Sequence, residues 1–377
     1  MRIHVFDNGL SSRTGHHFDF SLRLARSLTR RGHTVEMFGT LAAEPGLFEA
    51  LAAEGVAGRG LFSYCSHTPL DLGSDPYSKL EAMVRTAASE LRGVPPAQLN
   101  LFPSLTPLEF LAYSQSGIIA PTVGMAHGDP AFQNPFAARL WSLAAGNVRR
   151  QGLPFRLGAI DPVIADYLRT YLGGLPVSPF PIVQGGARKQ RYAAAVSIVG
   201  FFGAQRDERG MELLPELTER LLALGYHVVL HDTRRQFDSQ PTPPNLRRMN
   251  AFVDDLHAEM TQCDLVVCPM WRESYVHRIS GIVCDAVSSG VPFVLPAGTL
   301  SAARFYPLGS SACYHEQSVE GILQAIATIA ADYPAYAAAA ERAALQWPEQ
   351  HGVERFVDAV LPRSDRDAKA QGPVPAE

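Results

Sequence analysis

Short apolar runs alternate with longer amphipathic segments along most of this chain. In the first half the apolar runs occupy residues 2–6, 34–38, 98–102, 120–125 and 155–160. Strands that are buried on both faces read as continuous apolar runs, and their alternation with helical segments is typical of a parallel sheet covered by helices. The first half therefore predicts one Rossmann-like α/β domain.

A second series of the same kind begins after residue 195. Its apolar runs are residues 196–202, 227–231, 264–269 and 291–296, and they predict a second Rossmann-like domain. The chain would then begin with an N-terminal domain (residues 1–185), a linker (186–195) and a second domain (196–333). C-terminal helices that pack back toward the first domain (334–362) and a disordered tail (363–377) would follow. Residues 40–96 are less regular, and their elements cannot be ordered from the sequence.

Composition supports two folded domains and argues against nucleic acid as a partner. The chain has 377 residues, of which 46% are hydrophobic and 19% charged, and its formal net charge is −4. One hydrophobic core rarely serves a chain of this length. A basic run on one early helix is expected to be a solvated face, with weak contact to anionic lipid as the alternative. Its members are Arg23, Arg26, Arg30 and Arg31.

The five cysteines are odd in number and lack the short paired spacings of disulfide frameworks or zinc sites. The first residues turn polar after position 6, and no apolar run reaches the length of a membrane span. We therefore expect a cytoplasmic protein, with peripheral attachment at the inner face of the membrane as the alternative.

Residues 7–17 form the loop between the first strand and a helix that should begin near His17. Gly9 and Gly15 permit tight turns, and the amino terminus of the helix offers free N–H groups to an anion. The spacing differs from the dinucleotide pattern G-x-G-x-x-G, and the acidic residue expected directly after the second strand is missing, since "FGTLAAE" stands there. A nicotinamide cofactor is therefore disfavoured.

Residues 200–210 form the corresponding loop of the second domain. Gly203 is followed by Arg206 and Arg209, which lie at the entrance of a helix expected near Met211. Two cations beside the positive end of a helix dipole favour an anionic ligand such as a diphosphate. The alternative is that Asp207 and Glu208 neutralise them on a solvated loop.

Residues 271–297 carry the densest group of polar residues. They predict a helix from Tyr275 to Ser289, with Ser274 as its cap. One helical stripe would hold Ser274, Arg278, Gly281 and Asp285 on the face opposite the apolar one. This stripe is either a ligand-binding face, with Gly281 allowing close approach, or a solvent-exposed face without function.

Several strings together resemble a known family. "GAQRDERGMELLPEL" (203–217) is similar to the loop that opens the donor domain of GT-B glycosyltransferases, and "CDLVVCPMWRESY" with "CDAVSSGVPFV" resembles the acidic signature of that fold. "TGHHFDFSLRLARSLTRRGHTVEMFG", "HGDP" and "IDPVIADYLRTYLG" resemble the large retaining family of sucrose synthase-like and lipopolysaccharide mannosyltransferase-like enzymes. The resemblance implies a GT-B fold, in which two Rossmann-like domains face a central cleft.

The resemblance also implies sugar transfer from a nucleotide-sugar donor on the second domain to an acceptor facing the first. The acceptor would be a glycan, a lipid-linked glycan, a protein or a small molecule. By position, Arg209 would hold the diphosphate, Glu273 would contact the sugar, and Asp285 would hold the ribose. His127 matches a histidine close to the reacting centre.

The first loop completes the implied site. Gly15, with His16 and His17 beside it, matches a glycine-rich loop near the diphosphate or acceptor, and Asp129 follows the strand of the "HGDP" motif. Such a reaction needs neither a cofactor nor a metal, because cations and helix amino termini can stabilise the departing diphosphate. Retention is expected; inversion would require a protein base. The candidates for that base are His16, His17, Asp19, His127 and Asp129.

Two departures from the family pattern keep alternatives open. Ala204 stands where the family has a loop arginine, so Arg206 would supply that charge from a shifted position. Eleven residues separate Glu273 from Asp285, where the family has seven, an addition of about one helical turn. The alternatives are a GT-B-like scaffold without activity and a sugar-nucleotide epimerase of the same fold.

Overall fold

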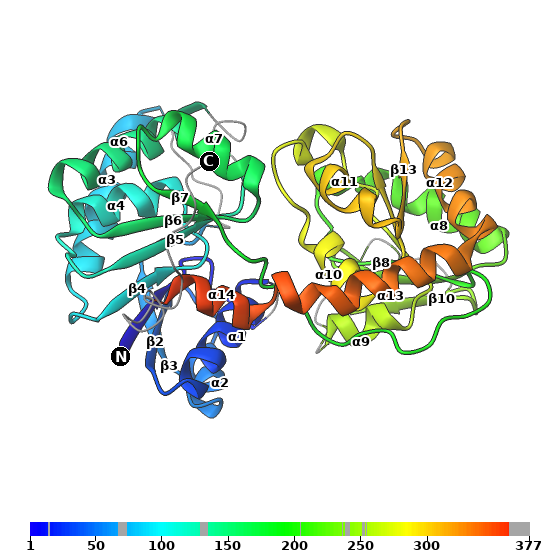
Figure 1. Cartoon of the computed structure of the whole chain (residues 1–377), viewed down its shortest axis with the longest axis horizontal. Coiled ribbons are helices and arrows are strands. Elements are labelled where there is room, and N and C mark those ends of the chain that lie inside the picture. The colour runs from blue at the N-terminus through cyan, green and yellow to red at the C-terminus, as the bar shows by residue number, and fades with distance from the viewer. Residues whose placement is uncertain are drawn as a thin grey trace, which may run out of the picture.

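Two parallel sheets organise the chain, one in each half (Figure 1). The computed structural model describes residues 1–13, 16–66, 74–128, 135–203, 205–235, 237, 242–250, 253 and 255–361, with the side chains of His16 and Pro135 excepted. The expected disordered tail, residues 363–377, lies outside the described residues.

The first sheet has seven parallel strands in the order β3-β2-β1-β4-β5-β6-β7. Its strands are β1 (Arg2–Phe6), β2 (Thr34–Thr40), β3 (Ala57–Phe62), β4 (Leu99–Phe102), β5 (Thr122–Ala126), β6 (Phe155–Ala159) and β7 (Val177–Pro179). The helices of this domain are α1 (His16–Arg30), α2 (Leu47–Ala53), α3 (Pro76–Arg92), α4 (Pro107–Ser116), α6 (Pro135–Gln151) and α7 (Pro162–Tyr171).

The second sheet has six parallel strands in the order β10-β9-β8-β11-β12-β13. Its strands are β8 (Ile198–Phe201), β9 (His227–His231), β10 (Leu246–Met249), β11 (Leu265–Val267), β12 (Phe293–Pro296) and β13 (Ser311–Tyr314). The longer helices are α8 (Leu214–Ala223), α9 (Leu256–Thr261), α10 (Gly281–Ser289), α11 (Leu300–Phe305), α12 (Val319–Ala331), α13 (Tyr333–Gln350) and α14 (Val353–Val360). Short 3-10 helices are η1 (Asp207–Arg209), η2 (Met211–Leu213), η3 (Arg272–Tyr275) and η4 (Tyr306–Leu308).

The apolar runs of the sequence form the strands that they predict. All nine expected runs contain a strand, and the two-sheet α/β architecture is confirmed. The region 40–96, which the sequence left unordered, contributes α2, the edge strand β3 and α3. Aromatic side chains from three adjacent strands stack inside the first domain: Phe6 lies 5.0 Å from Phe38 and 5.0 Å from Phe102, between ring centroids. Burial of such large rings is a main source of core stability.

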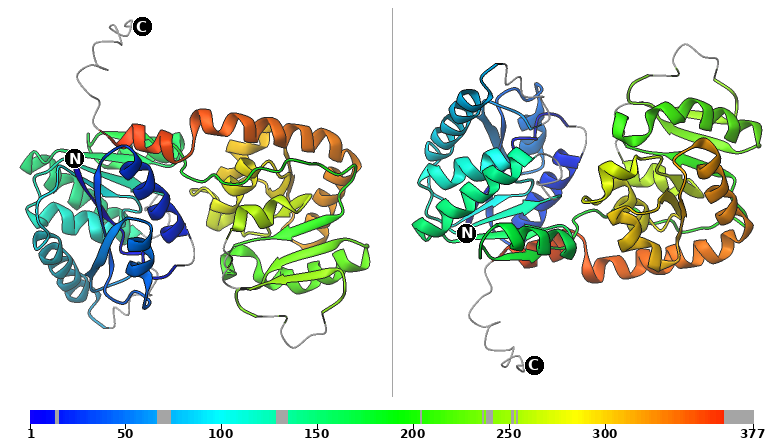
Figure 2. Two further views of the ribbon diagram at one scale, coloured as in Figure 1. Left: turned by 90° about the horizontal axis from the view of Figure 1, so that it is seen from below. Right: turned by 90° about the horizontal axis from the view of Figure 1, so that it is seen from above.

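The chain passes between the domains twice, and the two passages lie against each other. Helix α13 runs along the second domain, whereas α14 lies on the first (Figure 2). Trp347 Nε1 donates a hydrogen bond to Gln184 O at 2.8 Å, and Gly352 N donates to Ile182 O at 2.6 Å. The outgoing and returning segments are thus joined at the domain boundary by one side-chain and one backbone hydrogen bond.

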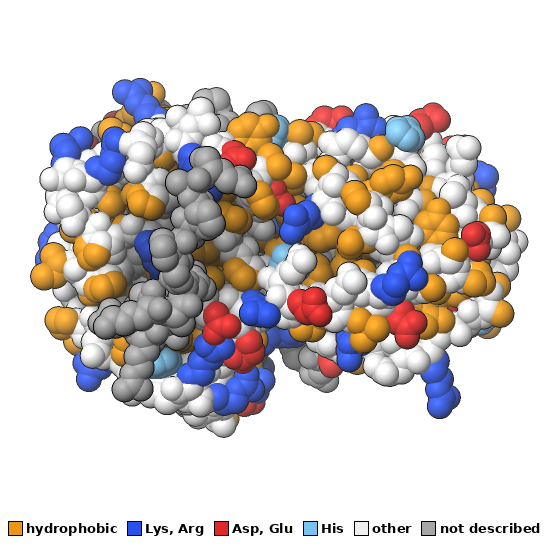
Figure 3. Space-filling model, viewed as in Figure 1, with side chains coloured by type: hydrophobic (Ala, Val, Ile, Leu, Met, Phe, Trp, Pro, Cys, Tyr) orange, Lys and Arg blue, Asp and Glu red, His pale blue; other side chains and the backbone are white. Residues whose placement is uncertain are grey.

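Helix α14 is attached to α1 by ion pairs. Arg30 pairs with Glu354 at 2.8 Å, and Arg31 pairs with Glu354 at 2.7 Å and Asp358 at 2.6 Å. Figure 3 shows basic and acidic side chains interspersed in this part of the surface.

The other two arginines of the early basic run are also paired. Arg23 contacts Asp19 at 3.0 Å, and Arg26 contacts Glu54 at 2.5 Å. All four arginines therefore face acidic partners, which disfavours the expected alternative of lipid contact. None of the described helices combines the length and the apolar character that crossing a bilayer requires.

A buried lysine fastens the linker to the second domain. Lys189 Nζ donates to Thr261 O at 3.1 Å and to Cys263 O at 2.7 Å, and it lies 3.4 Å from Asp264 Oδ1. The other oxygen of Asp264 accepts the backbone N–H groups of Ser197 and Ile198 at the start of β8. The side chains of Lys189 and Asp264 are each only 6% exposed.

We expect Lys189→Met to lower the free energy of unfolding of the second domain by about 3 kcal/mol, because it leaves a buried carboxylate without its cation. Urea denaturation would measure the change. Arg188→Met, at the exposed neighbouring position, should change it by less than about 0.5 kcal/mol. Equal effects of the two substitutions would contradict a structural role for the buried pair.

Candidate functional site at the domain boundary

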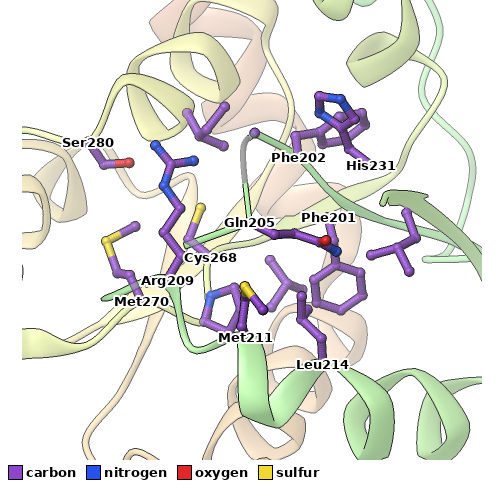
Figure 4. Close-up of a pocket in the computed structure, with 15 residues that line it drawn as sticks. Phe201, Phe202, Gln205, Arg209, Met211, Leu214, His231, Cys268, Met270 and Ser280 are labelled. Carbon is purple, nitrogen blue, oxygen red and sulfur yellow. The ribbon is translucent and has the colours of Figure 1, made fainter. Parts of the chain in front are cut away.

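An open cavity lies at the carboxyl ends of β8, β9 and β11 (Figure 4). Its empty volume, which includes open solvent at the mouth, is about 440 Å³. The strand order of this sheet reverses between β8 and β11, and ligands of open α/β sheets bind at such a switch point. Most lining residues are apolar, including Phe201, Phe202, Met211, Leu214 and Ile282.

Arg209 is the cation of this cavity. Its guanidinium extends from η1 toward Ser280 in Figure 4. The Nε atom is buried without a hydrogen-bond partner, and none of the described carboxylates forms an ion pair with this side chain. Gly203 makes room for it: with φ at 89°, a Cβ on Gly203 would lie 2.2 Å from Arg209 Nη1. The loop is therefore shaped around a cation that has no acidic partner among the described residues.

The other two predicted cations of the site are only loosely paired. Arg206 Nη1 lies 3.8 Å from Glu208 Oε1, and Arg278 Nη2 lies 3.5 Å from the same oxygen. Arg278 also stacks over the ring of Tyr275 at 4.1 Å. The backbone of Arg278 pairs with Gly128 of the first domain in an antiparallel bridge. The loop before α10 thus contacts both domains.

The helix expected from Tyr275 is shorter than predicted. Residues 272–275 form η3, and α10 begins only at Gly281, with Ser280 as N-cap. The bridge to Gly128 and a hydrogen bond from Ser280 N to Ser301 Oγ at 2.9 Å hold the intervening residues out of the helix. The predicted cap at Ser274 and the single stripe from Ser274 to Asp285 are therefore wrong. What reaches the cavity instead is the amino terminus of α10, where Ser280 Oγ is buried without a partner.

Asp285 lies one turn into α10 and is largely buried. Its Oδ1 lies 3.3 Å from His257 Nε2, and 14% of its side chain is exposed. Burial, together with the charge of Asp19 on α1, raises the pKa of Asp285 to about 7, while Arg23 and Arg209 act to lower it. Charges on both domains therefore affect the pKa of this carboxyl group.

The first domain presents a buried carboxylate and histidine at the end of β1. Asp7 Oδ1 accepts from Gly9 N at 3.0 Å and contacts His17 Nδ1 at 2.7 Å, while Oδ2 accepts from Ser21 Oγ at 2.9 Å. Burial acts to raise the pKa of Asp7, but these interactions outweigh it, and the pKa is lowered. Burial likewise acts to lower the pKa of His17, yet Asp7 keeps it raised. Arg206 of the second domain acts on the same imidazole, so the two loops face each other.

His127 and Glu109 border this pair. His127 Nε2 donates to Pro103 O at 2.8 Å, and burial lowers its pKa, so the ring is neutral at pH 7 with its lone pair on Nδ1. Glu109 forms a capping box with Thr106 at the start of α4. Burial raises the pKa of Glu109 to about 8, and the group is therefore largely a neutral acid at pH 7.

The structure brings most of the predicted residues to the domain boundary. Those that gather there are Gly203, Arg206, Arg209, Arg278, Asp285, His17 and His127. Of the predicted donor-site residues, Gly203 and Arg209 line the cavity, whereas Arg206, Ser274, Arg278 and Asp285 do not. Glu273 is exposed on η3 and does not line it either. Gly15 and Asp129 lie outside the described residues, as does Ala204. His16 begins α1, but its side chain is not described.

Sequence reasoning missed several polar residues of this region. Asp7 follows an apolar strand directly, and that position could have marked it as a loop-anchoring acid. Ser280 precedes Gly281 as a cap, but the expected earlier helix start obscured it. Gln205 lies within the recognised loop string but is uncharged, and His257 lies in a segment without a recognisable pattern; both become evident only through tertiary contacts. Gln205 Nε2 is buried in the cavity wall without a partner.

Comparisons with known proteins give no match by sequence. No protein-family model matches the chain, and no curated protein matches it.

Solved structures do share its architecture. The sucrose-phosphate synthase from Thermosynechococcus elongatus has a TM-score of 0.68 at 12% identity, over 95% of this chain and 96% of that chain. The fold is GT-B. HepE from Anabaena, in complex with UDP and glucose, has a TM-score of 0.64 at 15% identity, and the glycosyltransferase of kitacinnamycin has 0.63 at 18%. Each of these two covers 95% of this chain and 97% of the solved chain.

The GT-B fold explains why the two polar groups face each other. Its two Rossmann-like domains place the carboxyl ends of both sheets at the domain boundary, where Arg209 and Ser280 lie on one side and the Asp7–His17 pair lies on the other. The expectation of two parallel sheets in this architecture is confirmed. At these identities the likeness establishes the fold, while the chemistry has to be argued from the site.

We expect Asp7→Asn to lower the free energy of unfolding by about 3 kcal/mol, because it leaves the buried His17 without its counter-charge. The lowered pKa of Asp7 gives stability that is lost as pH falls below about 4, and the raised pKa of His17 gives stability that is lost as pH rises beyond about 6.5. The effect of the substitution should therefore be largest between these values.

Urea denaturation at several pH values would measure it. Glu81→Gln is a suitable control, since Glu81 and Arg85 form an exposed pair at 3.2 Å whose loss should cost less than about 0.5 kcal/mol. A loss for Asp7→Asn that does not vary with pH would show that the buried pair is not ionised.

Proposed function

We propose that the protein is a glycosyltransferase that binds a nucleotide-sugar donor on its second domain and transfers the sugar to an acceptor on the first. The observation that carries this proposal is Arg209, a cation without a described acidic partner, placed in the cavity beside the amino terminus of α10. Two solved structures of the same fold support it: one is the glycotransferase of kitacinnamycin, and the other, HepE, is in complex with UDP and glucose.

The groups around Arg209 suit a diphosphate. The first turn of α10 offers backbone N–H groups and the positive end of a nine-residue helix. Ser280 Oγ is buried there without a partner and can donate an O–H. A diphosphate would accept from the guanidinium, the hydroxyl and the backbone together, and the same donors would stabilise it as the leaving group.

We assign the remaining roles by their positions in the fold. Asp285 would accept the ribose hydroxyls of the donor. Glu273 remains our candidate for contact with the sugar, although it is exposed when no ligand is bound. Seven residues separate His277 from Asp285, which is the spacing that the family resemblance implies. The ring of His277 contacts Tyr167 of the first domain. It is therefore the second candidate for this contact.

The acceptor would bind against the first domain, near His17 and His127. The proposal covers glycan, lipid-linked glycan, protein and small-molecule acceptors, because the described side chains of this region do not select among them. Five described cysteines are free, which is compatible with the cytoplasm, where we propose that the protein works.

We further propose that transfer needs no metal and retains the anomeric configuration. Arg209, Ser280 and the α10 terminus can offset the charge of the diphosphate that a metal would otherwise offset. One observation favours inversion as the second candidate: the contact of Asp7 with His17 makes this imidazole more basic, as a general base requires.

A nucleotide screen tests the donor site. We expect one of UDP, TDP, GDP or ADP to raise the melting temperature, since a ligand at 100 times its dissociation constant adds about 2.7 kcal/mol. Arg209→Ala should weaken binding at least about tenfold through loss of a charged hydrogen bond. Arg220→Ala on α8 is the control, because this exposed arginine pairs only with Glu216 and Glu320 among the described residues.

The alternatives predict different results in the same experiment. An inactive scaffold would bind a nucleotide without transferring a sugar, or would bind none. An epimerase would convert the nucleotide-sugar without any acceptor. If no nucleotide stabilises the wild-type protein, or if Arg220→Ala weakens binding as much as Arg209→Ala does, the assignment of the donor site is wrong.

Metal independence and retention can be tested once the donor has been identified. We expect the transfer rate to be unchanged by EDTA, and the first product to keep the anomeric configuration of the donor, as read from the anomeric proton coupling by NMR. A rate abolished by EDTA and restored by Mg²⁺ or Mn²⁺ would overturn metal independence. An inverted product, together with a loss of about 100-fold or more in kcat for His17→Ala, would establish the second candidate.

A further inference from the structure

His257 joins the linker, α9 and α10 at one point. It is the second residue of α9 and is only 5% exposed. Its Nε2 lies 3.3 Å from Asp285 Oδ1, and its Nδ1 lies 2.9 Å from Ser289 Oγ. Ser289 is one turn beyond Asp285 on the same helix and is fully buried. The imidazole therefore bridges two polar side chains of α10.

The ring has little freedom to leave this position. Gly186 of the linker packs directly against it, and a Cβ on Gly186 would lie 2.5 Å from His257 Cγ. The hydrogen bond with Ser289 restricts rotation of the ring from the other side. A side chain held in this way presents a fixed direction to the carboxylate of Asp285.

The charge state of the ring defines what it can offer. Burial and the charge of Arg23 lower the pKa of His257 to about 4, so the imidazole is neutral at pH 7 and carries a single N–H. When the Ser289 hydroxyl donates to Nδ1, that N–H is on Nε2, the nitrogen that lies 3.3 Å from Asp285 Oδ1. A neighbouring N–H group favours a carboxylate over a neutral carboxylic acid.

We propose that His257 is a positioning residue of the donor site, which holds the carboxylate of Asp285 in the orientation and charge state that bind the ribose of the nucleotide. The inference rests on the proposed function, because it concerns the acid that we assign to the ribose. His257 itself does not touch the donor.

Other charges around Asp285 make its contact with His257 consequential. Asp19 on α1 and burial favour the neutral acid, while Arg23 on α1 and Arg209 on η1 favour the carboxylate. Asp255, at the cap of α9, acts on His257.

Two thiols complete these surroundings. Burial raises the pKa of Cys268 to about 12 and places that of Cys284 well above its ordinary value, so both are neutral at pH 7. With the pKa of Asp285 at about 7, the loss of the N–H group beside its carboxylate changes the charged fraction at neutral pH.

Two substitutions separate the two contacts of the ring. The amide of Asn occupies the place of Nδ1, so His257→Asn keeps a partner for Ser289 and removes the donor to Asp285. The amide of Gln reaches the place of Nε2, so His257→Gln keeps the donor to Asp285. Both variants replace the ring by an uncharged polar side chain, and each is the matched control of the other.

We would measure the pKa of Asp285 by ¹³C NMR of its carboxyl carbon in the ligand-free protein, and the Kd of the best nucleotide from pH 6 to 9. In His257→Asn the pKa should rise by about 1, as expected when a carboxylate loses a neighbouring N–H group. The Kd should then rise about fivefold at pH 7 and converge with the wild-type value at pH 9, because the binding-competent fraction recovers. In His257→Gln both quantities should stay close to wild type.

The two measurements keep this inference distinct from the proposed function. An unchanged pKa in His257→Asn would overturn it, and so would equal weakening of binding in both variants at every pH, which indicates a structural role only. If the wild-type protein binds no nucleotide, the proposed function and the ribose role are overturned. A raised pKa in His257→Asn alone would still support control of the Asp285 charge by His257.

Discussion

A parallel sheet covered by helices on both faces leaves its strands no contact with solvent except at their ends. Both sheets of this protein obey that constraint, since nearly all strand residues of β1, β4, β5, β9 and β12 are buried. Polar side chains that must meet a ligand are therefore confined to the loops that follow the strands. The two domains turn these loops toward each other, so Arg209 and the Asp7–His17 pair meet one boundary from opposite sides.

The boundary is held by few but varied contacts. The bridge between Gly128 and Arg278, the ring contact between Tyr167 and His277, and the hydrogen bond from Trp347 to Gln184 each join the two domains or the segments that connect them. Electrostatic coupling reaches further, because Asp19 and Arg23 of the first domain act on the pKa of Asp285 in the second. Any change in the separation of the domains would therefore alter the charge of the acid that we assign to the ribose.

The sequence predicted the layout of the fold because buried parallel strands produce continuous apolar runs that are visible without tertiary information. It could not order residues 40–96, where the edge strand β3 contains two glycines and is only partly buried. It also placed the start of α10 too early, since the apolar spacing extends back beyond Gly281 and the bridge that prevents helix formation comes from a distant segment.

For the site, the sequence analysis identified charged residues within loops. It missed residues whose role depends on contacts with residues far away along the chain. Arg206 and Arg209 stood out because cations at a helix entrance are unusual. His257 did not stand out, since its significance depends on Asp285 and Ser289, which are far from it along the chain. Glu109 looks like an ordinary capping residue in the sequence, and its burial together with the nearby charge of Asp7 raises the pKa of its carboxyl.

The return of the chain through α14 means that the two domains are separate in space but not in sequence. Phe356, Val357 and Val360 of this helix are buried, and Phe356 packs against Phe20 of α1 and Phe180 after β7. An N-terminal fragment that ended at the linker would expose this surface to water and would leave Arg30 and Arg31 without Glu354. The first domain thus becomes complete only when the last helix has been synthesised, so its final packing must follow translation of the entire second domain.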